Sequence, residues 1–429
     1  VFFSFQLGYA MSQLPPEKDP YASPTRPGKP DPYGEPPKTS GKAIASLLLS
    51  LVSVFTCGIT GIIALILGFM GLSDINNSQG RIKGSAFAMS GIVLTFMGFA
   101  MLIIAVPMAL LLLPAINAAR EAARRNGCLT NTRQLTLAAI NHEAAMKRFP
   151  LGTTATGPYV GPGAALPGSA EGDTAAGYSW TVQMIPYFEE VVLYDAIVAS
   201  SQRMETPAFD LSVRDASGQH PAQFQMPYLR CPTFSGDQLA TAPEYMGNPG
   251  AVAVGNYVGI PGTHIKSDGT LEENGVFVSK ASRAANGGKG IMLRDMGDGV
   301  SNTAIICESR EQAYASWYDG QSTWVTALRT TIDENNLTQG PDGFLQAPFD
   351  AAALSYGGDF DGDYFPAGRF PGQQGRAWGP SSEHTAGHVI HGFADGRASS
   401  ITPDVDPTVY MRCITRNGGE PLDTYQLSY

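Results

Sequence analysis

The chain has 429 residues, with 28 Lys and Arg against 38 Asp and Glu, so its formal net charge is -10. This length allows two or three structural units, and the acidic balance excludes the basic surface that a nucleic-acid partner requires. The 49 glycines and 31 prolines favour a turn-rich, β-containing fold with long loops over a helix-rich soluble enzyme.

The N-terminal segment, residues 1–41, is predicted to be a disordered, Pro-rich tail. After Met11 it is rich in proline, glycine and charge and has almost no aliphatic residues, so it cannot bury enough surface to offset its chain entropy. Residues 1–10 are apolar but lack the basic start of a signal peptide. Both Val1 and Met11 remain candidates for the start of the protein.

Two apolar runs without charged residues follow, at residues 43–72 and 86–116. Each exceeds the roughly 20 residues that cross a bilayer core, so residues 42–114 are predicted to form a transmembrane helical hairpin rather than a buried soluble one. Gly58 and Gly61 lie near the middle of the first run, where small residues bend a helix or let helices pack closely.

An even number of crossings places the tail and the C-terminal part on the same side of the membrane. The basic residues favour cytoplasmic ends, although large domains are translocated despite such charges. Two of these basic residues, Arg81 and Lys83, lie in the linker between the two runs. Five flank the runs: Lys38, Lys42, Arg120, Arg124 and Arg125. The charge rule therefore conflicts with an exported C-terminal domain.

Residues 115–150 are predicted to continue the second membrane helix as an amphipathic stem that ends at Phe149-Pro150. Residues 151–429 form the Gly-rich remainder, in which short β-type runs alternate with turn residues. These runs lie at residues 178–184, 256–260, 275–278 and 303–306. The predicted class is α+β, with an antiparallel sheet and long loops packed on the stem.

Four cysteines lie beyond the membrane segment: Cys128, Cys231, Cys307 and Cys413. No Cys-x-x-Cys spacing is present, so a zinc knuckle is not indicated. An even set is compatible with disulfides in an oxidising compartment and equally with buried thiols.

Six segments resemble, in order, the bacterial prepilin-like family of unknown function 1559, which is also labelled as solute-binding-like. They lie at residues 111–150, 179–197, 230–234, 256–263, 295–308 and 381–401, and include RCPTF, NYVGIPGT, DMGDGVSNTAIICE and SSEHTAGHVIHGFADGRASSI. The resemblance implies a pilin-like stem helix packed on a sheet. Residues 41–113 separately resemble a small two-helix membrane domain of unknown function, which implies membrane anchoring.

Two departures from that family pattern are present. The prepilin cleavage signature Gly-Phe-Thr-Leu-x-Glu is replaced by GSAFAMSG at the helix entry, which argues against prepilin processing. The C-terminal motif of the family is His, nine residues, Asp-Gly, whereas here ten residues separate His384 from Asp395-Gly396. We expect a bulge or a longer turn near Gly387 to accommodate the extra residue.

The histidines at positions 384, 388 and 391, together with Asp395, are the residues that suggest a metal site or a catalytic base. A strand beginning at His388 would point His388 and His391 to opposite faces, which disfavours a shared site. A structural role is expected instead, with Asp395-Gly396 forming a hairpin turn.

An acidic loop at Asp359, Asp361 and Asp363 offers the oxygen ligands that Ca²⁺ accepts. Tyr364 and Phe370 occupy the positions of the EF-hand glycine and glutamate, so this is not an EF-hand, and a solvated acidic loop is the alternative. No other cofactor is expected.

These features predict a membrane-anchored, pilin-like envelope protein in the inner membrane, with an extracytoplasmic domain in a structural or binding role and without catalysis. Its partners would be the lipid bilayer and either further copies of the chain or other envelope proteins. One alternative is a solute- or glycan-binding protein with an aromatic, polar pocket. Another is a metal-dependent hydrolase that uses His384 and Asp395, which needs a third ligand.

Overall fold

A computed structural model of the chain describes residues 38–56, 58–157, 159, 177–242, 245, 250–264, 266, 270–285, 287–327, 338–339, 345–346, 379–402 and 405–419. The chain divides into two compact units, Val1–Pro114 and Ala115–Tyr429. The structure is mixed helix and sheet, which confirms the α+β composition expected from the sequence.

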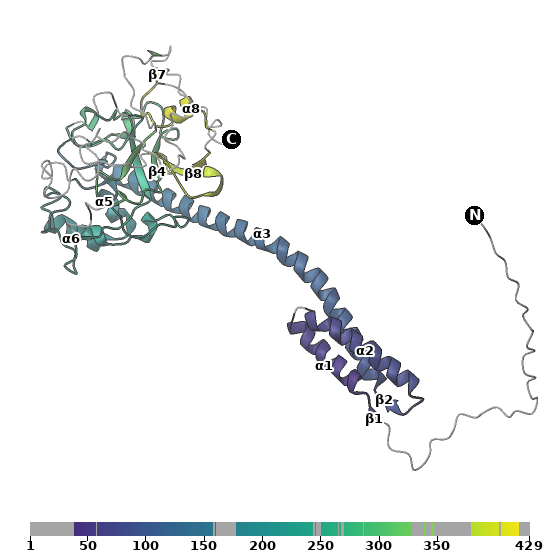
Figure 1. Cartoon of the computed structure of the whole chain (residues 1–429). Helices are drawn as coiled ribbons and strands as arrows, with labels where there is room; N and C mark the ends of the chain where they lie inside the picture. The colour runs from purple at the N-terminus through teal and green to yellow at the C-terminus, as the bar shows by residue number, and fades with distance from the viewer. Residues whose placement is uncertain are drawn as a thin grey trace, which may run out of the picture. The chain divides into compact units, whose positions relative to one another are not determined.

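The first unit contains helices α1 (Gly41–Phe55) and α2 (Ile59–Asn77), the short strands β1 (Lys38–Thr39) and β2 (Ile82–Lys83), and the start of α3 (Ser85–Met146). The prediction of one helix over residues 43–72 is wrong. Gly58 adopts a left-handed φ of 83°, which breaks the run into α1 and α2. The two helices lie antiparallel, since Gly71 of α2 contacts Ala43 of α1 (Figure 1).

Small residues form the contacts among these three helices. A Cβ built at Gly68 would lie 2.7 Å from Ile92 of α3 and 2.8 Å from Ser46 of α1, so glycine is needed there. The large apolar side chains point outward instead: Leu48 is 59% exposed and Met101 is 73% exposed. Small residues inside and large apolar ones outside is the packing of helices in lipid, so the unit is compatible with membrane anchoring.

Helix α3 comprises 62 residues; it begins in the first unit and its C-terminal part belongs to the second. Helices α2 and α3 are each long and apolar enough to cross a membrane. The C-terminal part of α3 is the predicted stem. Its buried face includes Leu135 and Ala139, whereas Met146 at the end of the helix is 60% exposed.

The second unit is built on a five-stranded sheet in the order β5-β3-β4-β8-β9. Its strands are β3 (Tyr257–Gly262), β4 (Ala304–Glu308), β5 (Trp324–Thr326), β8 (Val389–Phe393) and β9 (Ala398–Ile401). The predicted strands at 256–260 and 303–306 are thus confirmed as β3 and β4. The sheet is antiparallel except for β3 and β5, which pair in parallel, so the wholly antiparallel expectation is wrong at that edge.

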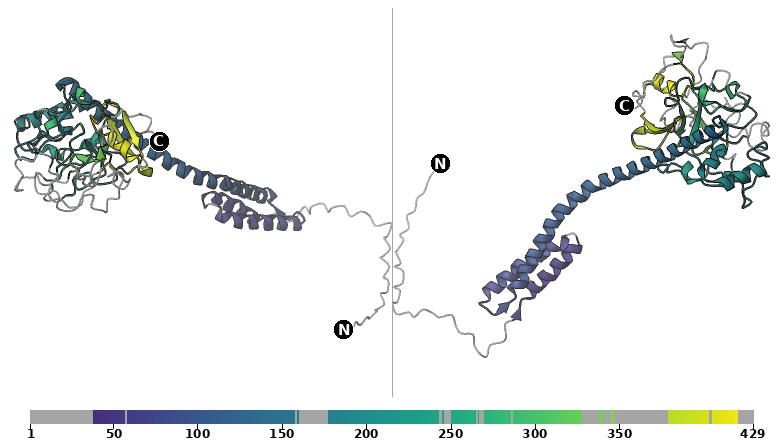
Figure 2. Two further views of the ribbon diagram at one scale, coloured as in Figure 1. Left: turned by 90° about the horizontal axis from the view of Figure 1, so that it is seen from above. Right: turned by 180° about the vertical axis from the view of Figure 1, so that it is seen from behind.

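Both faces of this sheet are covered. The stem part of α3 packs on one face, where Gly392 of β8 contacts Thr132 and Thr136 so closely that a Cβ has no room. Figure 2 shows the C-terminal end of α3 inside the second unit. The other face packs against α8 (Pro407–Arg412), with Tyr410 and Cys307 in a shared hydrophobic core. The residues of β4 therefore divide between two cores: Ile305 and Ile306 belong to the stem-side core, and Ala304 and Cys307 to the α8-side core.

The remaining elements of this unit are short and lie in the connections. They are α5 (Trp180–Met184), η1 (Ile185–Phe188), α6 (Val191–Ser200), η2 (Pro221–Gln223), η3 (Pro227–Leu229), η4 (Arg283–Ala285), η5 (Leu293–Asp295), β6 (Thr338–Gln339), β7 (Leu345–Gln346) and η8 (Thr385–Gly387).

Two predicted strands are wrong. Of residues 178–184, Tyr178 and Ser179 form isolated β-bridges and the rest form α5. The helix begins there because the hydroxyl of Ser179 accepts the N–H of Val182 and caps it. Residues 275–278 form a bend, in which the N–H of Gly275 donates to the carbonyl of Pro261 and that of Val278 to Val276. The local bond between Val276 and Val278 closes a turn in place of the ladder that a strand requires.

Candidate functional site

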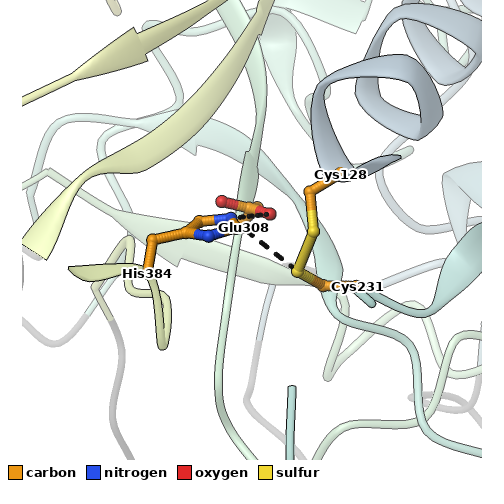
Figure 3. A group of neighbouring side chains, drawn as sticks. All are labelled: Cys128, Cys231, Glu308 and His384. Carbon is orange, nitrogen blue, oxygen red and sulfur yellow. Dashed lines mark hydrogen bonds and ion pairs between the residues drawn. A yellow bond between two sulfur atoms is a disulfide. The ribbon is translucent and has the colours of Figure 1, made fainter. Parts of the chain in front are cut away.

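Cys128 of the stem helix and Cys231 form a disulfide with a Cα–Cα distance of 5.2 Å and a sequence separation of 103 residues (Figure 3). Both residues are buried. This bond joins α3 to the loop that follows η3, and so ties the stem to the body of the second unit.

His384 lies against this disulfide, between two carboxylates. Its Nε2 atom is 3.3 Å from Oε1 of Glu308 and 3.9 Å from Sγ of Cys231. Its Nδ1 atom is 3.1 Å from Oε1 of Glu121 and 3.2 Å from the hydroxyl of Thr233. The stem, the Cys231 loop, the end of β4 and the loop before β8 therefore meet at one imidazole.

The sheet explains how Glu308 reaches this point. Glu308 is the last residue of β4, and its neighbour Cys307 faces the α8-side core, so alternation along the strand directs Glu308 to the stem side. Its Oε2 atom accepts the N–H of Ile390 from the adjacent β8 at 2.9 Å. One carboxylate oxygen thus fixes β8 while the other holds His384.

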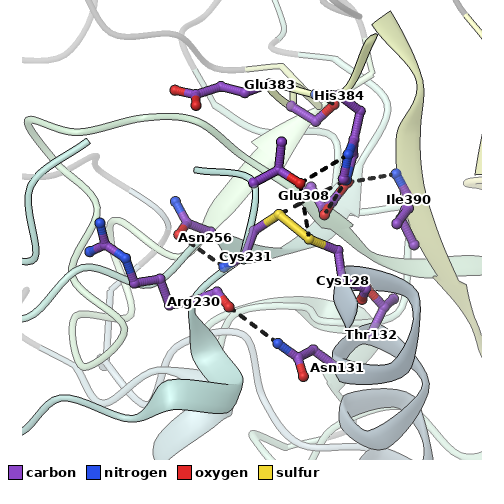
Figure 4. Close-up of a disulfide and its surroundings, with 12 residues drawn as sticks. Cys128, Asn131, Thr132, Arg230, Cys231, Asn256, Glu308, Glu383, His384 and Ile390 are labelled. Carbon is purple, nitrogen blue, oxygen red and sulfur yellow. Dashed lines mark hydrogen bonds and ion pairs between the residues drawn. A yellow bond between two sulfur atoms is a disulfide. The ribbon is translucent and has the colours of Figure 1, made fainter. Parts of the chain in front are cut away.

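The loop that carries Cys231 is fixed by two asparagine side chains (Figure 4). Oδ1 of Asn256 accepts the N–H of Cys231 at 3.2 Å, and its Nδ2 donates to the carbonyl of Ser309 at 3.1 Å. Nδ2 of Asn131, on the stem, donates to the carbonyl of Arg230 at 3.1 Å. These bonds hold the loop against α3 independently of the sulfur–sulfur bond.

The electrostatics favour a charged pair. Burial by itself lowers the pKa of His384, but its hydrogen bonds and charge interactions with Glu308 and then Glu121 outweigh burial, so the pKa lies above the usual value. Burial raises the pKa of Glu308, opposed by His384, by the N–H of Ile390 and by the charge of Arg125. A protonated His384 between two carboxylates is the arrangement that satisfies these buried groups.

A Thr–His–Glu arrangement raises the question of a nucleophile. Thr233 is 9% exposed, and the imidazole nitrogen that it contacts is shared with Glu121. An imidazole that carries its proton between two carboxylates has no basic nitrogen with which to activate a hydroxyl. The geometry fits a structural clamp better than acyl transfer.

The other candidates of the C-terminal motif do not join this site. Asp395 is exposed in the β8–β9 turn, where its Oδ1 accepts the N–H of Arg397 at 2.9 Å. His384 precedes β8 and Asp395 follows it, and five strand residues span roughly 16 Å. His384 and Asp395 therefore do not converge, as the hydrolase hypothesis requires them to.

The predicted hairpin turn at Asp395-Gly396 is confirmed, since β8 and β9 pair antiparallel around it and Gly396 has a φ of 88°. The extra residue of the motif is taken up by the 3-10 turn η8, which ends at Gly387 with a φ of 68°. His391 is fully buried on the opposite side of β8, where its Nε2 is 2.8 Å from the hydroxyl of Tyr410.

Cys307 and Cys413 are buried free thiols in the α8-side core. Burial raises the pKa of the Cys413 thiol to about 12, and the pKa of Cys307 is also raised by burial. The four cysteines thus include one disulfide and two apolar thiols. The acidic triplet Asp359, Asp361 and Asp363 lies outside the described residues.

An open surface cavity of about 520 Å³ lies away from the site, lined by residues that include Arg294, Asp295 and Arg416. No aromatic residue lines it, and the guanidinium of Arg416 already donates to the carbonyls of Glu273 and Gly275. The three described tryptophans are fully buried in the core: Trp180, Trp317 and Trp324. The aromatic pocket expected for a glycan-binding protein is not formed by these tryptophans.

Sequence reasoning missed Glu121, Thr233 and Glu308. A signal for Glu308 existed, because a glutamate ends the apolar run Ala-Ile-Ile-Cys and a buried carboxylate requires a partner. Four separate segments of the motif pattern each supply one residue here: Cys128, Cys231, Glu308 and His384.

Comparison with known families gives two matches. The model described as Protein of unknown function (DUF1559) matches residues 117–408, more than half of the chain, and the chain belongs to this family. The model described as Domain of unknown function (DUF4190) matches residues 42–105. No curated protein and no solved structure matches the chain.

Proposed function

We propose that this member of the DUF1559 family is a membrane-anchored envelope protein that displays its C-terminal unit outside the cytoplasmic membrane. Its role is structural or binding, and it performs no catalysis. The observation that carries this proposal is that one helix, α3, begins in an outward-apolar helix bundle and ends within a disulfide-bonded unit.

The basic residues of the first unit gather at one end of the bundle. Strand β1 pairs with β2, which places Lys38 beside Ile82 and Thr39 beside Lys83. At the same end, Nζ of Lys42 lies 2.8 Å from Asp74. The segment before α1 and the loop between α2 and α3 therefore share one side of the membrane.

Because α1 and α2 form a hairpin, the segment before α1 and the loop after α2 lie on the same side of the membrane. Helix α3 then carries the chain to the other side. With 15 residues, α1 is about 22 Å long, short of a bilayer core of about 30 Å, so the hairpin enters and returns. Deeper insertion of the hairpin leaves the same parity. The tail and the C-terminal unit lie on opposite sides, in place of the same side that a two-helix arrangement requires.

This parity removes the conflict with the positive-inside rule. Of the seven basic residues that flank or link the apolar runs, four now lie on the side of the tail and three on the side of the stem, namely Lys38, Lys42, Arg81 and Lys83 against Arg120, Arg124 and Arg125. The rule then favours a cytoplasmic tail and an exported C-terminal unit. A disulfide in that unit suits an oxidising compartment.

The non-catalytic role is supported by the site itself. Glu308 and the His384 side chain are each 1% exposed, and the described cavity lies elsewhere. A buried ion pair and a disulfide that join the stem to the sheet resist separation of the two, as a displayed domain requires. The exposed surfaces of the unit then meet other envelope proteins or further copies.

A reporter fusion tests the proposal. Alkaline phosphatase, which is active only outside the cytoplasm, is fused after Tyr429, and a matched control fusion is placed after Gly84, ahead of α3. We expect activity from the full-length fusion alone. An inactive full-length fusion, or activity from the fusion after Gly84, contradicts the proposed orientation.

A further inference from the structure

The disulfide site brings together four side chains of the types that bind metal ions. The Sγ atoms of Cys128 and Cys231, a carboxylate oxygen of Glu308 and a ring nitrogen of His384 all lie within 4.8 Å of one another. All four residues are buried. Two thiolates, one imidazole and one carboxylate form a closed tetrahedral donor set for zinc.

The orientation of His384 fits a ligand. Its Nε2 atom faces the other donors, 3.9 Å from Sγ of Cys231 and 3.3 Å from Glu308. Its Nδ1 atom is held by the Glu121 carboxylate and the Thr233 hydroxyl. A metal-bound histidine is usually fixed in this way, with a carboxylate on the nitrogen that does not bind the metal.

We propose that the chain binds one Zn²⁺ through Cys128, Cys231, Glu308 and His384 when the two cysteines are in their dithiol form. The zinc form and the disulfide form are alternative states of one site. The zinc form belongs to the chain before its disulfide has formed, and to the chain after reduction.

The chemistry of the two states balances. Formation of the disulfide removes two electrons and two protons from the thiols, which a disulfide-bearing oxidant accepts as it becomes two thiols. Zinc binding to the dithiol involves no electron transfer. Two S–H protons and the Nε2 proton of His384 are released as the Zn–S, Zn–N and Zn–O bonds form.

The two remaining described thiols do not complete such a site. Cys307 and Cys413 lie in the α8-side core, on the other face of the sheet from Glu308. No set of three metal-binding side chains that includes them is found among the residues that the structure describes. Cys413→Ala is therefore the matched control.

The test uses the full-length chain in detergent, reduced with a phosphine and titrated with Co²⁺ and then Zn²⁺. We expect one equivalent of Co²⁺, with the visible bands of a tetrahedral site and thiolate charge transfer in the near ultraviolet, displaced by one equivalent of Zn²⁺. The oxidised chain shows neither. Glu308→Gln and His384→Gln each abolish these bands, and Cys413→Ala keeps them.

Glu121→Gln distinguishes the supporting carboxylate from the proposed ligands. It should weaken Zn²⁺ binding by about 10- to 100-fold, while the chain still binds one equivalent. If reduction unfolds the domain, Zn²⁺ should restore its near-ultraviolet circular dichroism, since binding is coupled to folding. The proposal is overturned if the reduced chain binds less than stoichiometric metal, or if Glu308→Gln and His384→Gln bind it as the unaltered chain does.

Discussion

Nε2 of His384 lies 3.3 Å from Oε1 of Glu308, and the side chains of both residues are only 1% exposed. Glu308 ends β4, and His384 lies in the loop before β8. This pair forms where the stem helix, the disulfide and the sheet come together. The stability of the second unit should therefore depend on it.

Removal of one partner of the pair leaves a buried charge uncompensated. In the oxidised chain with a chelator present, Glu308→Ala should lower the free energy of unfolding by about 3 to 5 kcal/mol. The double variant Glu308→Ala with His384→Ala should cost clearly less than the sum of the two single changes. Denaturant unfolding of the four chains checks this, and simple additivity would contradict a coupled pair.

Loss of the disulfide should also be costly. The bond closes a loop of 103 residues, so Cys128→Ser together with Cys231→Ser should reduce stability by about 2 to 5 kcal/mol. Cys413→Ala, which removes a free thiol from the other core and keeps the disulfide, should lose stability on reduction as the unaltered chain does, whereas the double variant should not respond to reductant. Melting curves with and without reductant compare these chains. Equal curves for the double variant and the unaltered chain without reductant would contradict a stabilising role of the disulfide.

Acid should destabilise the sheet through His391. Burial lowers the pKa of His391 to about 4, and its hydrogen bond to the carbonyl of Val389 opposes this shift only in part. Nε2 of the ring lies 2.8 Å from the Tyr410 hydroxyl. The unfolded chain, with a histidine pKa near 6.5, binds the proton more tightly, so stability is complete above pH 6.5 and falls toward pH 4.

Between pH 6.5 and pH 5 this linkage amounts to about 2 kcal/mol for one histidine. His220, whose pKa burial also lowers to about 4, adds a similar loss. His391→Gln should therefore reduce the loss of stability between pH 7.5 and pH 5. Unfolding free energies measured at pH 7.5 and pH 5 decide this, and an unchanged pH dependence in the variant would argue that His391 is charged in the folded protein.

Close approach of the stem to β8 should make Gly392 sensitive to enlargement. A Cβ there would lie 3.0 Å from Thr132 and still closer to Thr136, so Gly392→Ala should cost about 1 to 3 kcal/mol. Gly157→Ala is the control, since nothing lies within 4 Å of its Cβ position. A Gly392→Ala chain as stable as the control would show that α3 does not pack on the sheet as described.

The stem and the central strands could be predicted from the sequence because local patterns specify them. Apolar spacing marks the buried face of the stem, and the runs that became β3 and β4 are bounded by turn residues. The break at Gly58 was harder to predict, since a glycine inside an apolar run is compatible with both a straight and a folded helix. The outcome depends on packing against α3.

The site depended on long-range contacts that no local pattern encodes. The sequence marked Cys128, Cys231 and His384 separately, but the pairing of the cysteines and the approach of Glu121 and Glu308 require the assembled stem and sheet. Asp395 was placed with His384 because both belong to one motif. The length of β8 keeps them apart.

The most direct test of the account is labelling of cysteines, introduced one at a time, with a membrane-impermeant maleimide in spheroplasts. The chain used has Cys57 replaced by Ser. Asn77→Cys marks the exposed C-terminal end of α2, Ser217→Cys marks an exposed turn of the C-terminal unit, and an N-terminal tag read by protease protection marks the tail. We predict that Ser217→Cys is labelled in intact spheroplasts, whereas Asn77→Cys and the tag are reached only after lysis. Accessibility of the tag together with Ser217→Cys, or labelling of Ser217→Cys only after lysis, would contradict a single crossing by α3 and an exported domain.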